Sequence, residues 1–427
     1  MGILNNSDYI CALDISSSKV SGAVAKIKRK DITDIFFETL PSKGIKRGSI
    51  SDSIDIITCV ETVLRNLKIK SGINIAYIYI NISGEDIITK HSRAIIPLAE
   101  RGNKIITLSD IQKVNEQARI LGSSLEEEII DEIPFGYTID SRNNISSPLG
   151  LYSHKLEVDL YLVCAKLSSL QTLTRVINQA GYEIKDLFFS AVATSQGVFD
   201  IQSRNFSEQV NILCDIGSDI TEILIFKNAM LKDIAILPVG GDDLTIALSE
   251  ALNIPFELAE EVKKSYGRIQ DFNDAGTQQD KEILIKKDNI YKPIKQKAVV
   301  DIVTSKAKLI SGYIKEKIQQ VVPFNEVNNL VVCGRTVLLE GFIEVLENNL
   351  GATVKLARAA NPKILSLSGN NDVLSGHKYL TYLTTLGMVS KALQDEQIQF
   401  MPDCKASGKH PVSKIFNRIK EVCQEYF

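Results

Sequence analysis

NILCDIGSDITEILIFK, residues 211–227, decides the fold, because the chain carries a second copy of its pattern. YICALDISSSKVSGAVAKIK, residues 9–28, has the same order of apolar strand, polar turn and apolar strand. The repeat predicts a duplicated β-unit, one in each of two lobes, and two unrelated β-hairpins are the alternative. At an offset of 201 residues the copies share four identities: Asp14 with Asp215, Ile15 with Ile216, Ser17 with Ser218, and Lys26 with Lys227.

The segments around the two copies predict how the chain is divided. Strands expected near 32–39 and 73–82, with a helical stretch at 54–67, continue the first lobe. The order of predicted strands and helices changes at 84–166, which we interpret as an inserted α+β subdomain. We therefore expect six parts: 1–83 with 167–197 as lobe I, 84–166 as the inserted subdomain, 198–241 with 330–393 as lobe II, 242–329 as its helical subdomain, 394–411 as a flexible linker, and 412–427 as a terminal helix.

The composition is that of a globular protein and argues against several classes. Hydrophobic residues make up 44% of the 427 and charged residues 24%, and the formal net charge is −3, which leaves no basic surplus for nucleic-acid phosphates. No apolar run reaches the ~18–20 residues needed to cross a bilayer, and no signal-peptide pattern opens the chain. The seven cysteines form no CxxC pair, and Cys11, Cys164, Cys214 and Cys333 lie inside apolar strand-like runs, a pattern typical of a protein in a reducing cytosol.

The polar turns inside the two copies are candidates for phosphate binding. Small residues let backbone N–H groups point at an anion, and hydroxyl groups add donors. Asp14 and Asp215 would hold Mg²⁺ through water, because Mg²⁺ prefers oxygen ligands and keeps much of its hydration. Either turn alone could equally be an ordinary hairpin turn. The turn residues are Asp14, Ser16, Ser17, Ser18 and Lys19 in the first copy, and Asp215, Gly217, Ser218 and Asp219 in the second.

Four further motifs give the chain a resemblance to a known family. PVGGDD at 238–243 resembles the glycine pair that follows the second phosphate loop of the actin superfamily, and CGRTVLLEG at 333–341 resembles its adenosine loop. GIKRGSI at 44–50 and AEEVKKSYG at 259–267 resemble a characteristic loop and a ribose-contacting helix of the FtsA family of actin-like bacterial cell-division proteins. The resemblance to the FtsA family extends over the whole chain.

This resemblance implies a fold and a binding site. The fold would be α/β, the duplicated two-lobed actin-like (ribonuclease H-like) ATPase fold, with ATP and Mg²⁺ as ligands. Ser16 and Arg335 depart from the family pattern, because they stand where glycines are usual and a side chain there can block close backbone approach. We expect Ser16 to be tolerated, and Arg335 only if its side chain swings out. The nucleotide-binding residues added to the two turns are Gly240, Gly241, Glu260, Lys263, Gly334, Arg335 and Thr336.

Hydrolysis of ATP is expected to be slow or absent. Transfer of a phosphoryl group to water needs a side chain that orients the attacking water. Active relatives place Gln or Glu near the start of the helix that joins the lobes, where this chain offers Phe189 and Ser190.

The C-terminal segment predicts a membrane-binding helix. Pro411 marks its start, and the apolar residues that follow fall on one helical stripe. A short, basic, two-faced helix suits the headgroup region of a bilayer, and docking on the protein's own body or on a partner is the alternative. The expected membrane-binding residues are Val412, Ile415, Phe416, Ile419, Val422 and Tyr426 on the stripe, with Lys414, Arg418 and Lys420 beside it.

By its resemblance, the chain is expected to be a peripheral scaffold at the cytoplasmic face of the cell membrane, at the division site. The implied partners are the tubulin-like FtsZ, docking at about 242–329, other division proteins, anionic lipids, and further copies of the chain in filaments; nucleic acid is not expected. One alternative is an adaptor like the pilus-assembly protein PilM. A less favoured alternative is a small-molecule kinase of the same superfamily, for which the sequence offers no convincing catalytic-base aspartate.

Overall fold

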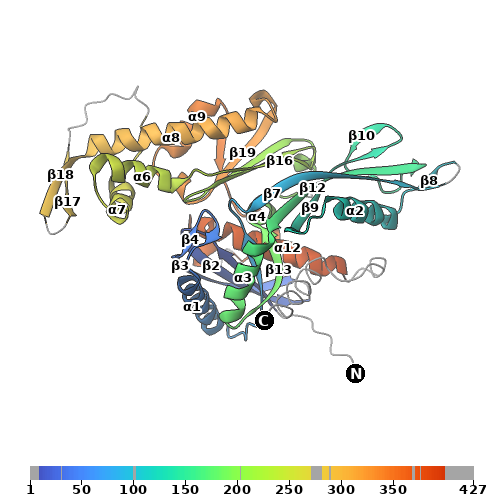
Figure 1. Cartoon of the computed structure of the whole chain (residues 1–427), viewed down its shortest axis with the longest axis horizontal. Helices are drawn as coiled ribbons and strands as arrows, with labels where there is room; N and C mark the ends of the chain where they lie inside the picture. The colour runs from blue at the N-terminus through green and yellow to red at the C-terminus, as the bar shows by residue number, and fades with distance from the viewer. Residues whose placement is uncertain are drawn as a thin grey trace. The chain divides into compact units, whose positions relative to one another are not determined.

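The computed structural model of the protein divides into two compact units; Figure 1 shows the whole chain. Among the described residues, unit 1 contains those up to 208, those at 226–232 and those from 358 onward, and unit 2 contains 209–225 and 233–357. The structure describes residues 9–29, 31–99, 102–201, 203–270, 281–287, 290–367, 371–375 and 377–399.

Unit 1 is built on a five-stranded sheet with the order β13-β6-β1-β2-β3. β1, β2 and β3 form an antiparallel meander, while β6 pairs in parallel with both β1 and β13. Every residue of β1 after Tyr9 is buried, as expected for a central strand with both faces covered. The strands are β1 (Tyr9–Ile15), β2 (Lys19–Lys28), β3 (Asp31–Pro41), β6 (Tyr77–Ile82) and β13 (Glu183–Phe189), and a two-stranded hairpin, β4 (Ile45–Lys46) with β5 (Ser49–Ile50), follows β3.

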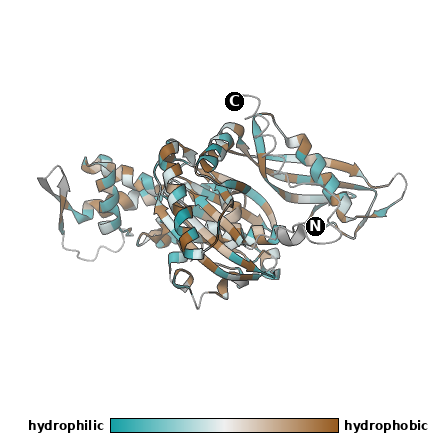
Figure 2. Ribbon diagram, turned by 90° about the horizontal axis from the view of Figure 1, so that it is seen from below, coloured by the Kyte–Doolittle hydropathy of each residue, from teal (hydrophilic) through white to brown (hydrophobic). Residues whose placement is uncertain are grey.

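Helices cover both faces of this sheet (Figure 1). α1 (Ser53–Ser71) and α3 (Leu167–Gln179) cover one face, and α4 (Ser190–Val198) and α12 (Leu383–Gln399) cover the other. On the α12 face, alternate residues of β1 belong to one apolar cluster with the inner side of the helix. Figure 2 shows how apolar residues gather in the strands and on the helix faces beside them.

The C-terminal part of the chain corrects the division expected from the sequence. Residues 330–393 are expected in lobe II, which is wrong after residue 357, because the rest belongs to unit 1. Leu386 and Val389 of α12 complete the core of that unit. Helical periodicity indicates that one face of α12 is buried, but not which sheet it packs against. α12 also runs to Gln399, so the first residues of the expected linker are helical.

Residues 84–166 form the inserted α+β subdomain, as predicted. Its four-stranded antiparallel sheet has the order β10-β9-β12-β7, and β8 (Lys104–Ile105) pairs with β11 (Tyr152–Ser153). α2 (Leu108–Gly122) begins at a capping box made by Thr107 and Asp110 and buries Val114 and Ala118 against the sheet. The sheet strands are β7 (Ile87–Pro97), β9 (Glu127–Ile139), β10 (Arg142–Ile145) and β12 (Lys155–Lys166).

Unit 2 repeats the sheet of unit 1. Its order is β16-β15-β14-β19-β20, so in both units the first strand lies at the centre, with the next two strands on one side and two later, parallel strands on the other. The matching order confirms the predicted duplication and the actin-like fold class. The strands are β14 (Val210–Ile216), β15 (Thr221–Lys227), β16 (Met230–Leu237), β19 (Val327–Cys333) and β20 (Val354–Leu356).

Helices of unit 2 carry most of its remaining core. α8 lies beside α6, α7 and α9 (Figure 1), and the hairpin β17–β18 precedes it. Val299, Val303 and Ala307 of α8 are buried in the same apolar cluster as Leu244 of α6 and Val262 of α7. These elements are α6 (Gly241–Leu252), α7 (Phe256–Tyr266), β17 (Glu282–Lys287), β18 (Ile290–Lys295), α8 (Gln296–Gln319) and α9 (Phe342–Leu350).

The predicted terminal helix at 412–427 lies outside the described residues. Among the helices that the structure does describe, none is long and apolar enough to cross a membrane.

Candidate nucleotide-binding site

The first predicted turn joins β1 to β2 in unit 1. The Ser16 N–H donates to the Lys19 carbonyl oxygen at 3.0 Å, and the Ser16 hydroxyl lies at the same distance from that oxygen. Ser17 accepts a long hydrogen bond, 3.4 Å, from the Gly48 N–H. Ser16, Ser17 and Ser18 are all half-buried, so the turn is accessible to a ligand from one side.

Asp14, the last residue but one of β1, is 3% exposed and fully paired. Its Oδ1 accepts a hydrogen bond from Asn81 Nδ2 at 2.8 Å, and its Oδ2 lies 3.3 Å from both the Ser21 hydroxyl and Lys19 Nζ. Lys19 Nζ also donates to the Thr381 carbonyl oxygen. A buried carboxylate needs such partners, because burying an unpaired charge is costly.

The second predicted turn joins β14 to β15 in unit 2 and has the same backbone geometry. The Gly217 N–H donates to the Ile220 carbonyl oxygen at 2.9 Å, the same bond as in the first turn at the same 201-residue offset (Ser16 to Gly217). Asp215 is half-buried and forms a side-chain hydrogen bond with Cys333. The two copies therefore share a backbone conformation as well as a sequence pattern.

The other predicted residues of unit 2 lie around this turn. The carbonyl oxygen of Gly217 accepts hydrogen bonds from the Gly241 N–H at 3.0 Å and from the Thr336 hydroxyl at 2.7 Å. A Cβ on Gly240 would lie 2.6 Å from the Ser218 carbonyl oxygen, so only glycine allows this close approach. The glycine pair and the predicted adenosine loop thus support the second turn directly.

A charged cluster lies behind the glycine pair. Lys263 Nζ donates to the Gly241 carbonyl oxygen at 2.8 Å and to the Thr245 hydroxyl at 2.7 Å, and it lies 2.6 Å from Glu260. Burial alone would raise the pKa of Glu260, but hydrogen bonds from Lys263 and Thr245 outweigh it and lower the pKa to about 2. Glu260 is therefore a fixed anion that holds Lys263 in place.

Asp242 has the opposite electrostatic character. Burial raises its pKa to about 6, and the negative charges of Asp219, Glu260 and Asp243 act in the same direction against the opposing charge of Lys263. Asp242 therefore carries its negative charge at neutral pH and becomes neutral only as the pH falls below about 6.

The backbone has ordinary angles at both departures from the family pattern. Neither Ser16 nor Arg335 has positive φ, and Arg335 has ordinary helical angles of −78° and −22°. Its side chain is exposed, as a residue that swings out would be. Gly334, the residue before it, has φ 88° and packs against the Ile216 carbonyl oxygen, so glycine is required there.

Sequence reasoning missed Asn81 and Thr245, and it considered Ser190 only as a group that could orient water, not as a partner of Asn81. Asn81 is 2% exposed at the end of β6 and contacts Asp14, and Thr245 contacts both Glu260 and Lys263. An amide in an otherwise apolar strand, such as that of Asn81, is the only signal that could have found one of them. Among the described residues, no group of three or more His, Cys, Asp or Glu could hold a metal ion. A metal at Asp14 or Asp215 would thus need oxygens from a nucleotide and water.

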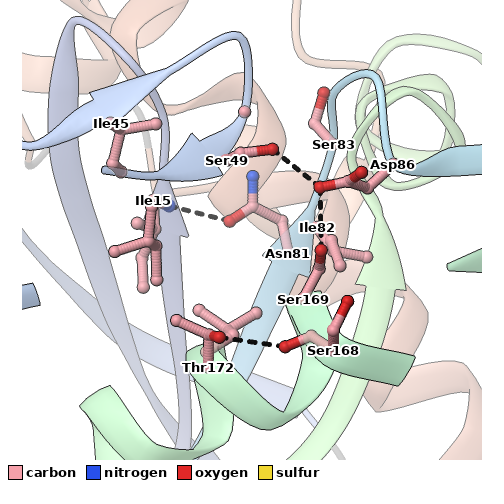
Figure 3. Close-up of a pocket in the computed structure, with 13 residues that line it drawn as sticks. Ile15, Ile45, Ser49, Asn81, Ile82, Ser83, Asp86, Ser168, Ser169 and Thr172 are labelled. Carbon is pink, nitrogen blue, oxygen red and sulfur yellow. Dashed lines mark hydrogen bonds between the residues drawn. The ribbon is translucent and has the colours of Figure 1, made fainter. Parts of the chain in front are cut away.

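A cavity of about 210 Å³ lies in unit 1, beside the first turn (Figure 3). Its wall includes Ile15 and Asn81, and on its far side Asp86 accepts hydrogen bonds from the hydroxyls of Ser49 and Ser169. The hydrogen bond from Lys166 is the largest influence on Asp86 and lowers its pKa. The cavity thus lies where the chain leaves lobe I for the inserted subdomain and returns from it.

Two units with one strand order and a matching polar turn in each define a protein of the actin-like class. Solved structures agree: a PilM–PilN type IV pilus biogenesis complex matches with a TM-score of 0.60 at 14% identity, covering 90% of this chain and 98% of the other. MreB5 of Spiroplasma citri bound to ADP matches with a TM-score of 0.52 at 11% identity, covering 92% and 99%. At these identities the matches show a shared fold.

Within that class, the chain belongs to the FtsA family of cell-division proteins. The family model "Cell division protein FtsA" matches residues 212–383, and "SHS2 domain inserted in FTSA" matches residues 84–164. FtsA of Bacillus subtilis is 24% identical over 93% of this chain and 86% of its own length. FtsA of Pseudomonas aeruginosa is 22% identical over the full length of both chains.

Proposed function

We propose that this protein is an ATP-binding scaffold of bacterial cell division that tethers FtsZ to the cytoplasmic face of the cell membrane and assembles with copies of itself. The observation that carries the proposal is the pair of matching turns, each with an aspartate, in a chain of the FtsA family. The membrane attachment, the FtsZ contact and the self-assembly go beyond family membership and are part of the proposal.

ATP with Mg²⁺ is the proposed ligand of the two turns. Asp14 and Asp215 would hold the metal through water, and the N–H groups and hydroxyls of the turns would take the phosphates. The MreB5 structures bound to ADP and to AMPPNP, which share the fold, support a nucleotide ligand. Ser190 and Phe189 offer no group to orient an attacking water, so turnover should stay below ~1 s⁻¹.

The terminal segment would provide the membrane contact. Each large apolar side chain gains at most ~1.5–3 kcal/mol on full burial, and each cation adds ~1 kcal/mol near anionic lipid. Ordering the segment costs ~1–2 kcal/mol per residue. A single tail should therefore bind weakly and reversibly, and stable attachment would need several tails presented together by self-assembly.

The helical subdomain at 242–329 is the proposed docking region for the FtsZ tail. Ile246 of α6 and Phe256 of α7 are exposed there, which gives a partner apolar contacts. Titration of a labelled FtsZ tail peptide with the full chain tests this contact, and the absence of binding would contradict it.

Co-sedimentation with anionic liposomes tests the membrane proposal. Phe416→Glu places a charge on the apolar stripe and should release the protein, as should a chain that ends at Ala406. Asn417→Glu adds the same charge on the polar side of the same helix and should reduce binding much less. Equal sedimentation of Phe416→Glu and the parent would show that the tail is not the anchor.

The alternatives are less well supported. The PilM match shows the fold alone, whereas both family models and the curated relatives are FtsA proteins. A kinase would turn over ATP with an acceptor, so coupled assays with sugars and carboxylates should show no acceptor-dependent activity.

A further inference from the structure

Asn81 lies at the end of β6 with its orientation set by hydrogen bonds. Its Oδ1 accepts from the Ile15 N–H at 2.7 Å, so its Nδ2 must face the other way, toward Asp14 and Ser190. Figure 3 shows Asn81 reaching from β6 to the backbone of Ile15 at the wall of the cavity. Because the cavity leaves one side of this amide unpacked, hydrogen bonds rather than packing fix its position.

Ser190 bonds to the Nδ2 group of Asn81, opposite the oxygen that contacts Ile15, and in this sense braces the amide. It is the first residue of α4, is 6% exposed, accepts from Asn81 Nδ2 at 2.8 Å and donates to the Ile82 carbonyl oxygen at 3.0 Å. Its hydroxyl thus links the side-chain amide of Asn81 to the backbone at the end of β6.

The two oxygens of Asp14 are held unequally. Oδ1 has a short contact, 2.8 Å, with the amide of Asn81, whereas Oδ2 has two long contacts, both 3.3 Å, with Ser21 and Lys19. The short contact fixes the position of Oδ1, whereas Oδ2 carries two longer contacts, one of them the ion pair to Lys19. Lys19 Nζ also has the Thr381 carbonyl oxygen as a partner, so a water molecule can replace the contact to Oδ2 without leaving the ammonium unpaired.

We propose that Asn81, braced by Ser190, is a positioning residue that fixes Asp14 Oδ1 so that Oδ2 is presented to the water shell of a magnesium-bound nucleotide. The inference rests on the proposed nucleotide function and adds the residues that orient the metal-holding carboxylate. On binding, Oδ2 exchanges its long contacts for metal-bound water, while Oδ1 stays on the amide.

The test compares ATP affinity with and without Mg²⁺ in the full chain, by calorimetry in MgCl₂ and in EDTA. Asn81→Leu keeps the shape of the side chain and removes its hydrogen bonds. It should weaken Mg-ATP binding at least ~tenfold, equivalent to ~1.4 kcal/mol, and change the affinity for metal-free ATP less than ~twofold. Ser190→Ala should give a smaller loss of the same kind, about threefold, because Asn81 keeps its bonds to Ile15 and Asp14.

The control is Asn66→Leu, which removes a half-buried amide bonded to Glu38 in the same unit. It should leave both affinities unchanged. If Asn81→Leu fails to fold, Ser190→Ala carries the test alone.

The outcomes separate this inference from the proposed function. Equal losses with and without Mg²⁺, or no loss in either variant, would overturn the positioning role while ATP binding stands. A parent protein that binds no ATP would overturn both.

Discussion

The two polar turns have the same backbone hydrogen bond but are supported by different means. In unit 1, polar side chains surround the turn: Asp14 is buried against Asn81, Ser21 and Lys19. In unit 2, backbone groups approach closely through glycines, and the Thr336 hydroxyl bonds directly to Gly217. One backbone conformation can thus be maintained by a side-chain network or by glycine contacts.

The largest effect is expected when a glycine that allows close backbone approach in unit 2 is replaced. Gly334 and Gly351 both have positive φ, 88° and 67°, but only at Gly334 would a Cβ overlap a neighbouring group, the Ile216 carbonyl oxygen. Gly334→Ala should lower the free energy of unfolding by ~3 kcal/mol or more, and Gly351→Ala by only ~1 kcal/mol, the cost of the backbone conformation alone. Urea unfolding measures both, and equal losses would refute the role of close approach.

A second comparison exchanges each aspartate for alanine. Asp215→Ala should weaken Mg-ATP binding at least ~tenfold, or ~1.4 kcal/mol, because its carboxylate would organise the metal's water shell. Asp14→Ala should do the same and also destabilise the protein by ~1–3 kcal/mol, because it removes one of the two hydrogen bonds donated by the buried Asn81 amide and the carboxylate partner of the Lys19 ammonium. Calorimetry and thermal unfolding separate the two effects. An unchanged dissociation constant in Asp215→Ala would rule out the proposed site geometry.

Acid should act on the two units in opposite directions. In unit 1, burial raises the pKa of Asp186 to about 7, reinforced by the charges of Asp131 and Asp395 and opposed by Lys391 and the Leu187 N–H. An unfolded Asp titrates near ~3.9, so the folded protein binds the extra proton and loses stability as the pH rises from about 4 to about 7. Raising the pH from 5 to 8 should destabilise the parent by ~1–2 kcal/mol relative to Asp186→Asn.

Glu260 of unit 2 provides the opposite case. Its pKa of about 2 lies below the unfolded value of ~4.3, so its contribution is present above that pH and is lost as the pH falls toward 2. The parent should therefore lose more stability than Glu260→Gln between pH 5 and 3, measured as unfolding midpoints. Parallel pH profiles of parent and variant would contradict this assignment.

The smallest expected effect is in the first turn itself. Ser16 stands where unit 2 has Gly217, and its hydroxyl contacts the same carbonyl oxygen as its own N–H. Ser16→Gly should change ATP affinity less than ~threefold and stability by ~0.5–1 kcal/mol. The reverse change, Gly217→Ser, should cost more, because its Cβ would lie 2.9 Å from the Ile220 carbonyl oxygen. Equal losses of stability in Ser16→Gly and Gly217→Ser would mean that the two turns tolerate either residue.

The sequence predicted what is local and missed what depends on distant contacts. The duplicated strand–turn–strand unit, the inserted subdomain and the glycine pair could be predicted because each is encoded within a few dozen residues. The partners of Asp14 could not, since Asn81 follows it by 67 residues and the hydroxyl that braces Asn81 lies a further 109 residues along the chain. The role of an amide at the end of a strand depends on which strand lies beside it, and that is set by the sheet.

The dependence on distant contacts also explains why the assignment of residues 358–393 to lobe II was wrong. The neighbours of α12, which are β1 and α4, come from the start and the middle of the chain. Arg335 illustrates a milder case. Its place in the motif suggested an obstruction to the nucleotide, and the structure gives it a helical backbone and an exposed side chain, which the sequence did not predict.

The crossing of α4 and α12 has a mechanical consequence. Gly197 and Gly387 let the two helix backbones approach so closely that a Cβ on Gly387 would overlap the Ala193 carbonyl oxygen. Thr194 and Thr384 also share a hydrogen bond at 3.1 Å. A force directed along the axis of α12 would be opposed by this interlocked crossing, which would pass the force from α12 to α4.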